Sequence, residues 1–159
     1  MSINIQERFQ KMGLGEKIIL IAGPLLFIDG FLRWYDAGCV SLGTLGNICG
    51  TASGWQAPGS LWSILAILIG IAMSAVVGVT AFTTVQMPAL PQGVTWPRVH
   101  LGLAAAASLL IIIKLLNHSG DLAYGFFIAI VLVAALDAGA FLLFQAEQKG
   151  GSAPSAPSM

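Results

Sequence analysis

Charged residues are scarce in this chain, and their scarcity excludes several classes of protein. Asp, Glu, Lys and Arg make up 9% of the 159 residues, whereas a soluble domain carries about 25%. Disorder, which needs low hydrophobicity and high charge, is excluded by a hydrophobic content of 57%. The seven basic residues balance the seven acidic ones, and without a basic patch we predict no nucleic-acid binding.

Motifs that carry catalysis or bind cofactors are also missing. The sequence contains no Walker loop, dinucleotide-binding fingerprint, HExxH pair or nucleophile elbow. His100 and His118 fall at opposite ends of one apolar segment, about 27 Å apart along a helix, so they cannot share a metal or a haem. Either histidine could ligate a porphyrin from one side, but a lone histidine at a membrane interface is usually solvated. We therefore predict no metal, no cofactor and no enzymatic activity.

Long apolar runs are what the sequence has in abundance. A membrane-spanning helix needs about 20 mostly apolar residues, and no charged residue occurs between residues 37 and 97. That run is too long for one span, and glycines and prolines interrupt it. We predict an all-α membrane protein, a four-transmembrane-helix bundle over residues 16–145, with the bilayer as its surroundings. The four predicted spans are residues 16–35, 61–83, 98–117 and 122–145.

The first predicted span is shorter and less regular than the others. Its uncharged part, residues 18–28, contains Pro24. A basic start followed by a short apolar core is also typical of a signal peptide, but Asp36 stands where a lipoprotein cleavage box has an aliphatic residue. We interpret the segment as a retained span, with Trp34 and Tyr35 as an aromatic anchor at its outer end.

The positions of Lys and Arg predict the orientation. Cytoplasmic loops of membrane proteins are enriched in these residues, and with both termini inside, five of the seven basic residues face the cytoplasm. The inner five are Arg8, Lys11, Lys17, Arg98 and Lys149, and the outer two are Arg33 and Lys114. We predict a multi-pass protein of the plasma (inner) membrane. Residues 1–15 would form an amphipathic segment on the inner leaflet, residues 36–60 an outer loop, and residues 146–159 a flexible cytoplasmic tail.

The two cysteines, Cys39 and Cys49, both lie in the predicted outer loop. Extracytoplasmic compartments favour disulfides, and the nine intervening residues are mostly small or turn-forming. A bridge over such a short loop stabilises by about 2–3 kcal/mol in the chain-entropy model. We predict that a disulfide closes this loop; free thiols or metal ligands are the alternatives, and no nearby histidine supports a metal.

Asp137 is the most unusual residue, because it lies inside the fourth predicted span. A charge at the centre of a membrane helix costs about 2.5–3.5 kcal/mol, so we expect this side chain to face other helices. By depth, Ser108 and Ser74 are its candidate partners. The carboxyl either joins helices by hydrogen bonds or handles protons or ions. Asp29 and Arg33 are four residues apart, and we expect them to pair along one helix.

Small residues recur at every fourth position of the second predicted span. They are Ala66, Gly70, Ser74 and Gly78. Such stripes let helix backbones approach closely in lipid. The spacing predicts close packing, either within the chain or against another copy.

Three stretches carry a resemblance to a known group of proteins. They read GEKIILIAG at residues 15–23, FLRWY at 31–35 and IKLL at 113–116. The chain resembles uncharacterised bacterial four-span membrane proteins, in which the first span ends in FLPWY and a Trp- and Gly-rich outer loop follows. Arg33 replaces the proline of that motif. The resemblance implies four spans and no assigned activity.

Two functional hypotheses follow from these observations. The first is a non-catalytic accessory, assembly or self-associating structural component, whose partner is itself or another membrane protein. The second is a small channel or transporter that uses Asp137, together with Ser74 and Ser108, as an intramembrane polar cluster. The absence of catalytic motifs and the stripe of small residues favour the first.

Overall fold

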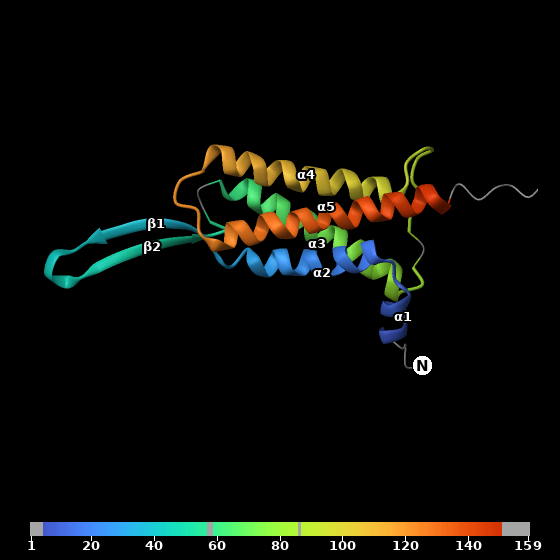
Figure 1. The fold of residues 1–159 in the computed structure, drawn as a ribbon, viewed down its shortest axis with the longest axis horizontal. Helices are drawn as coiled ribbons and strands as arrows, with labels where there is room; N and C mark the ends of the chain where they lie inside the picture. Colours follow the sequence, from blue (N-terminus) through green and yellow to red (C-terminus); the bar gives the residue numbers. More distant parts are fainter. Residues whose placement is uncertain (1–4, 57–58, 86, 151–159) are drawn as a thin grey trace, which may run out of the picture.

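Helices make up most of the chain. The computed structural model describes residues 5–56, 59–85 and 87–150, and Figure 1 shows the long helices side by side with a hairpin extending from one end. In chain order the elements are α1 (Ile5–Lys11), α2 (Leu14–Asp29), β1 (Arg33–Ser41), a 3₁₀ turn (Gly43–Leu45), β2 (Asn47–Ser53), α3 (Ser60–Phe82), α4 (Trp96–Asn117) and α5 (Tyr124–Gly150).

The four long helices form a closed ring around an apolar core. Contacts join α2 to α3, α3 to α4, α4 to α5 and α5 back to α2. The core side chains with no exposed surface include the aliphatic and thioether groups of Ile19, Leu26, Ile67, Met73 and Leu136. The short helix α1 is steeply inclined to the long helices near one end of the bundle and contacts α3 (Figure 1).

Three of the helices are long and apolar enough to cross a membrane within the described part of the chain: α3, α4 and α5. They match the predicted spans 61–83, 98–117 and 122–145 to within a few residues, except that α5 continues to Gly150. Three such helices indicate a membrane protein. Residues 151–159 of the predicted tail, like residues 1–4 of the N-terminal segment, lie outside the described residues.

The predicted span 16–35 needs correction. Its helix, α2, has 16 residues and ends at Asp29, so it is shorter than a standard span. The indole Nε1 of Trp34 donates a hydrogen bond to the Asp29 carbonyl oxygen at 2.9 Å, and this bond occupies a carbonyl at the helix end. The chain then continues as a strand from Arg33.

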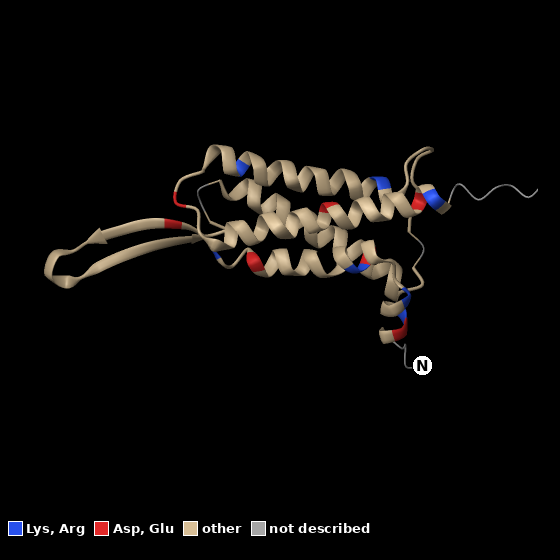
Figure 2. Cartoon of the chain, viewed as in Figure 1, with Lys and Arg blue, Asp and Glu red and all other residues tan. Residues whose placement is uncertain are grey.

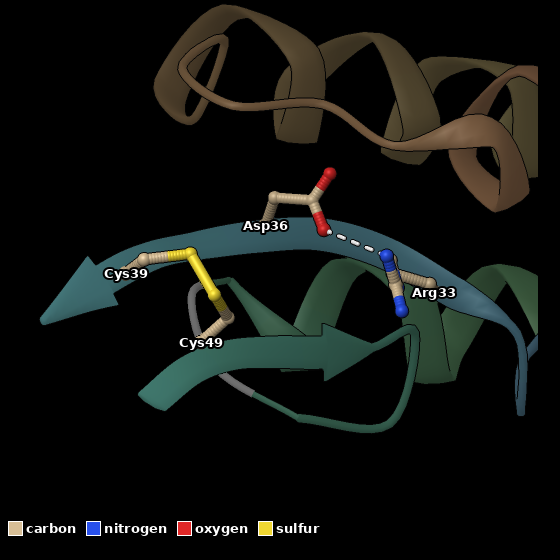
Figure 3. Close-up of polar contacts among 4 residues, drawn as sticks. All are labelled: Arg33, Asp36, Cys39 and Cys49. Carbon is tan, nitrogen blue, oxygen red and sulfur yellow. Dashed lines mark ion pairs between the residues drawn. A yellow bond between two sulfur atoms is a disulfide. The ribbon is translucent and has the colours of Figure 1, made fainter. Parts of the chain in front are cut away.

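The expectation of an all-α fold is also wrong for the segment between α2 and α3. Residues 33–53 form an antiparallel β-hairpin in which Cys39 faces Cys49 across the strands. The turn contains Gly43 and Gly46 with φ of 64° and 96°, a region that favours glycine. The predicted Cys39–Cys49 disulfide is confirmed, and Figure 3 shows it linking the two strands.

The predicted stripe of small residues packs against another helix of the same chain. Ala66, Gly70 and Ser74 are buried, and Gly78 is half-buried. A Cβ atom added to Gly23 of α2 would overlap the Gly70 carbonyl and the Ser74 hydroxyl. The stripe therefore lets α2 and α3 approach closely, and its buried members Ala66, Gly70 and Ser74 are used in packing within the chain.

Candidate functional site

Asp137 and Ser108 meet at the seam between two helices. Asp137 lies halfway along α5 and Ser108 halfway along α4. The Ser108 hydroxyl donates a short hydrogen bond to Oδ2 of Asp137. The other candidate partner, Ser74, donates instead to the Ile19 carbonyl oxygen at 2.6 Å. The structure thus brings one of the two predicted serines to Asp137 and places the other between α2 and α3.

A groove of about 210 Å³ opens over this pair on the outer face of α4 and α5. Its walls are aliphatic except for Ser108 and Asp137, and they consist of Ile111, Ile112 and Leu115 from α4 and Ile130, Val133 and Ala134 from α5. Asp137 is half-buried, and Ser108 is its one hydrogen-bond partner in the described part of the chain. The carboxyl group therefore opens toward the apolar surroundings of the bundle, at mid-helix depth.

Charged residues otherwise lie toward the two ends of the bundle, as Figure 2 shows. Arg98 donates to the Gly93 carbonyl oxygen at 2.6 Å, in the turn before α4. Arg8 reaches the Ala81 carbonyl oxygen at the same end, at 3.3 Å. No described Lys, Arg or His forms an ion pair with Asp137, so its chemistry within this chain is limited to accepting the Ser108 hydrogen bond.

Lys114 lies in the last turn of α4, near the span end where the sequence places it, but its side chain is fully buried, which the sequence analysis does not predict. Its ammonium donates to the Ser63 hydroxyl at 2.7 Å and lies 4.9 Å from the ring centroid of Trp34 and 5.2 Å from that of Tyr35. Such distances allow cation–π attraction. Lys114 therefore ties α4 to α3 and to the first residues of the hairpin.

Helical periodicity could have revealed the burial of Lys114. The buried positions of α4 are spaced alternately four and three residues apart, which marks one face of a helix. They are His100, Ala104, Ala107, Ile111 and Lys114. Lys114 continues this stripe, so the side chain points into the bundle even though it lies near the helix end.

The expected pair between Asp29 and Arg33 does not form. The Arg33 guanidinium lies 3.4 Å from the Asp36 carboxylate on the same strand, and both side chains are half exposed (Figure 3). The Asp29 carboxyl is buried without a hydrogen-bond partner among the described residues. The helix ends between Asp29 and Arg33, so the four-residue spacing no longer places them on one face.

The β1–β2 hairpin presents apolar side chains near its turn. Val40 and Ile48 lie opposite each other on the two strands and are 67% and 63% exposed. Leu45, in the turn, is 86% exposed. No charged residue occurs in the hairpin beyond Asp36, so its distal half is an uncharged arm stabilised by the disulfide.

The described residues contain no group of three or more His, Cys, Asp or Glu side chains that could hold a metal ion. No protein-family model matches the chain, and no curated protein or solved structure matches it. The resemblance to four-span bacterial membrane proteins therefore stays a prediction. The geometry of the seam between α4 and α5 is the main basis for a functional proposal.

Proposed function

We propose that this chain is a non-catalytic accessory or assembly component of a membrane, and that it holds another transmembrane segment at the groove between α4 and α5. One observation carries the proposal: the Asp137 carboxyl, paired with Ser108, opens onto an apolar outer groove at mid-helix depth. Polar residues at such positions join transmembrane helices by hydrogen bonding across the interface.

The apolar interior of the bundle supports assembly over transport. A transport pathway needs polar groups that follow one another across the membrane. Most buried side chains of the bundle are apolar, among them Ile19, Met73 and Leu136. Of the buried polar groups, Ser74 donates to a backbone carbonyl oxygen and Lys114 donates to Ser63. Asp137 lies at the seam beside this core and not within a continuous polar path, so it is better placed to meet a neighbour than to pass an ion inward.

The proposal includes a fourth span and an orientation. The 16 residues of α2 rise about 24 Å, which a locally thinned bilayer accommodates, and α2 lies alongside α3 and α5 in the ring. With the termini in the cytoplasm of a plasma membrane, the hairpin faces an oxidising compartment, where its disulfide is stable. The excess of Lys and Arg on the other side agrees with this orientation.

Mass measurement after mild-detergent extraction from the host membrane tests the assembly role. We expect wild-type protein in particles whose polypeptide mass exceeds the 16.6 kDa of one chain. Asp137→Asn should keep them, because an amide still forms hydrogen bonds, whereas Asp137→Leu should release single chains. Ile21→Ala is the control, since Ile21 is 51% exposed on α2, outside the groove. Single wild-type chains, or intact particles with the leucine variant, would overturn the proposal.

A further inference from the structure

We infer that the transmembrane helix received by the α4–α5 groove carries a basic side chain, lysine or arginine, near its middle. This inference rests on the proposed function and adds the chemistry of the partner. It starts from Asp137, whose carboxyl group has Ser108 as its one partner in the described chain. A hydroxyl donates one proton, so the carboxyl still has free lone pairs directed at the groove.

Charge complementarity favours a basic partner over a second copy of this chain. No lysine or arginine lines the groove: Lys114 is buried against Ser63, and the arginines contact groups near the bundle ends. A second copy packed groove to groove would therefore add another acid and no cation. Like charges in a medium of low dielectric repel strongly, whereas an ammonium or guanidinium would neutralise Asp137.

The groove also suits the shape of a long basic side chain. Lysine and arginine bury their aliphatic stems along apolar surface while the charged end meets a polar group. Ile111, Ile112 and Val133 offer such a wall beside the carboxyl. Ala134 and Ala138, both exposed on α5, leave little bulk beside Asp137, so a partner backbone is able to come close. The charged end of the partner's side chain would therefore meet Asp137 while its aliphatic stem packs on the neighbouring apolar side chains.

Two synthetic single-span peptides test this inference with the wild-type protein. Both have the same leucine–alanine host helix and flanks, and one carries lysine at its centre where the other carries leucine. The protein is labelled with a donor dye at Gln92→Cys, in the exposed segment before α4, and each peptide carries an acceptor. Energy transfer in vesicles of neutral lipid, at increasing peptide-to-lipid ratio, gives the two affinities.

We expect the lysine peptide to associate about tenfold or more tightly than the leucine peptide. Asp137→Leu should remove this preference, and Ser108→Ala, which keeps the acid, should retain most of it. Equal association of both peptides with wild-type protein, or a lysine preference that survives in Asp137→Leu, would overturn the inference.

A further result separates this inference from the proposed function. If neither peptide associates but the wild-type protein forms dimers that Asp137→Leu dissociates, a second copy occupies the groove. The assembly role then stands and the basic partner is wrong. If the wild-type protein associates with neither peptide and stays a single chain in the mass measurement, both proposals fail.

Discussion

Lys114 shows how a single polar side chain stabilises the end of the bundle next to the hairpin. Its ammonium has no acidic partner within 4.0 Å in the described chain, and its contacts are one hydroxyl and two aromatic faces. A buried cation is costly unless such groups replace its hydration. Its aliphatic stem also fills space in the bundle, so packing and charge contribute separately.

These two contributions predict different outcomes for two substitutions. Lys114→Ala removes the stem as well as the ammonium, and we expect a loss of about 2–4 kcal/mol in the free energy of unfolding. Lys114→Met keeps most of the side-chain volume and removes the buried charge, so it should lower the free energy of unfolding clearly less than Lys114→Ala does. Thermal unfolding in detergent measures both, with Leu109→Ala as the control, because Leu109 is 57% exposed on the same helix. Equal losses for alanine and methionine would contradict the packing role.

Close approach of helices depends on glycine at a few defined positions. Gly23 of α2 faces Gly70 and Ser74 of α3 with no room for a side chain. Gly102 of α4, in contrast, has open space around it within 4 Å. The two glycines therefore have different roles, one in packing and one on the exposed face.

We expect Gly23→Ala to destabilise the bundle by about 1–3 kcal/mol, since the added methyl group must separate α2 from α3. Gly102→Ala should be neutral or should stabilise by up to about 1 kcal/mol, because alanine is the better helix former. Unfolding curves of both variants in one detergent make the comparison. Similar stability of the two variants would show that α2 and α3 do not pack through these glycines.

The hairpin is an element whose order depends on a covalent link. Most side chains of its distal half are exposed, and an isolated two-stranded hairpin is only marginally stable in water. The Cys39–Cys49 disulfide joins facing positions of the two strands. It therefore supplies the stability that packing does not.

Replacing both cysteines by serine should loosen the hairpin and leave the bundle intact. We expect the hairpin to lose about 2–3 kcal/mol of local stability, which faster amide hydrogen exchange in residues 37–53 would show. Exchange in α3 and α5 should not change, because the distal side chains of the hairpin are exposed and not packed in the bundle. If exchange rises equally in the helices, the hairpin is an integral part of the bundle and not a separate arm.

The sequence predicted the long helices better than the hairpin and the buried lysine. Apolar runs of span length identified α3, α4 and α5, since a membrane sets the length of such segments. The prediction of a loop over residues 36–60 missed the two strands, because small residues and glycines hide the alternation typical of a strand. The contact between Ser108 and Asp137 was predictable from depth, whereas the seam and its groove depend on how α4 and α5 pack.

The orientation of the whole molecule is tested by two single cysteine substitutions. Gln92→Cys lies in the segment between α3 and α4, and Ser119→Cys lies between α4 and α5; both side chains are exposed. We expect a membrane-impermeant maleimide to label Ser119→Cys on intact cells and to label Gln92→Cys only after the membrane is opened. The opposite pattern would invert the orientation and place the disulfide in the cytoplasm.

Transport by the whole bundle is the main rival to an assembly role, and Asp137 is the residue on which the two accounts differ. Proton and ion flux into proteoliposomes, measured for wild-type protein and for Asp137→Asn, separates them most directly. The amide variant should keep the fold, because it retains hydrogen bonding at the seam with Ser108. We predict no flux above that of protein-free vesicles for either protein. A wild-type flux that Asp137→Asn abolishes would contradict the account and make Asp137 part of a transport pathway.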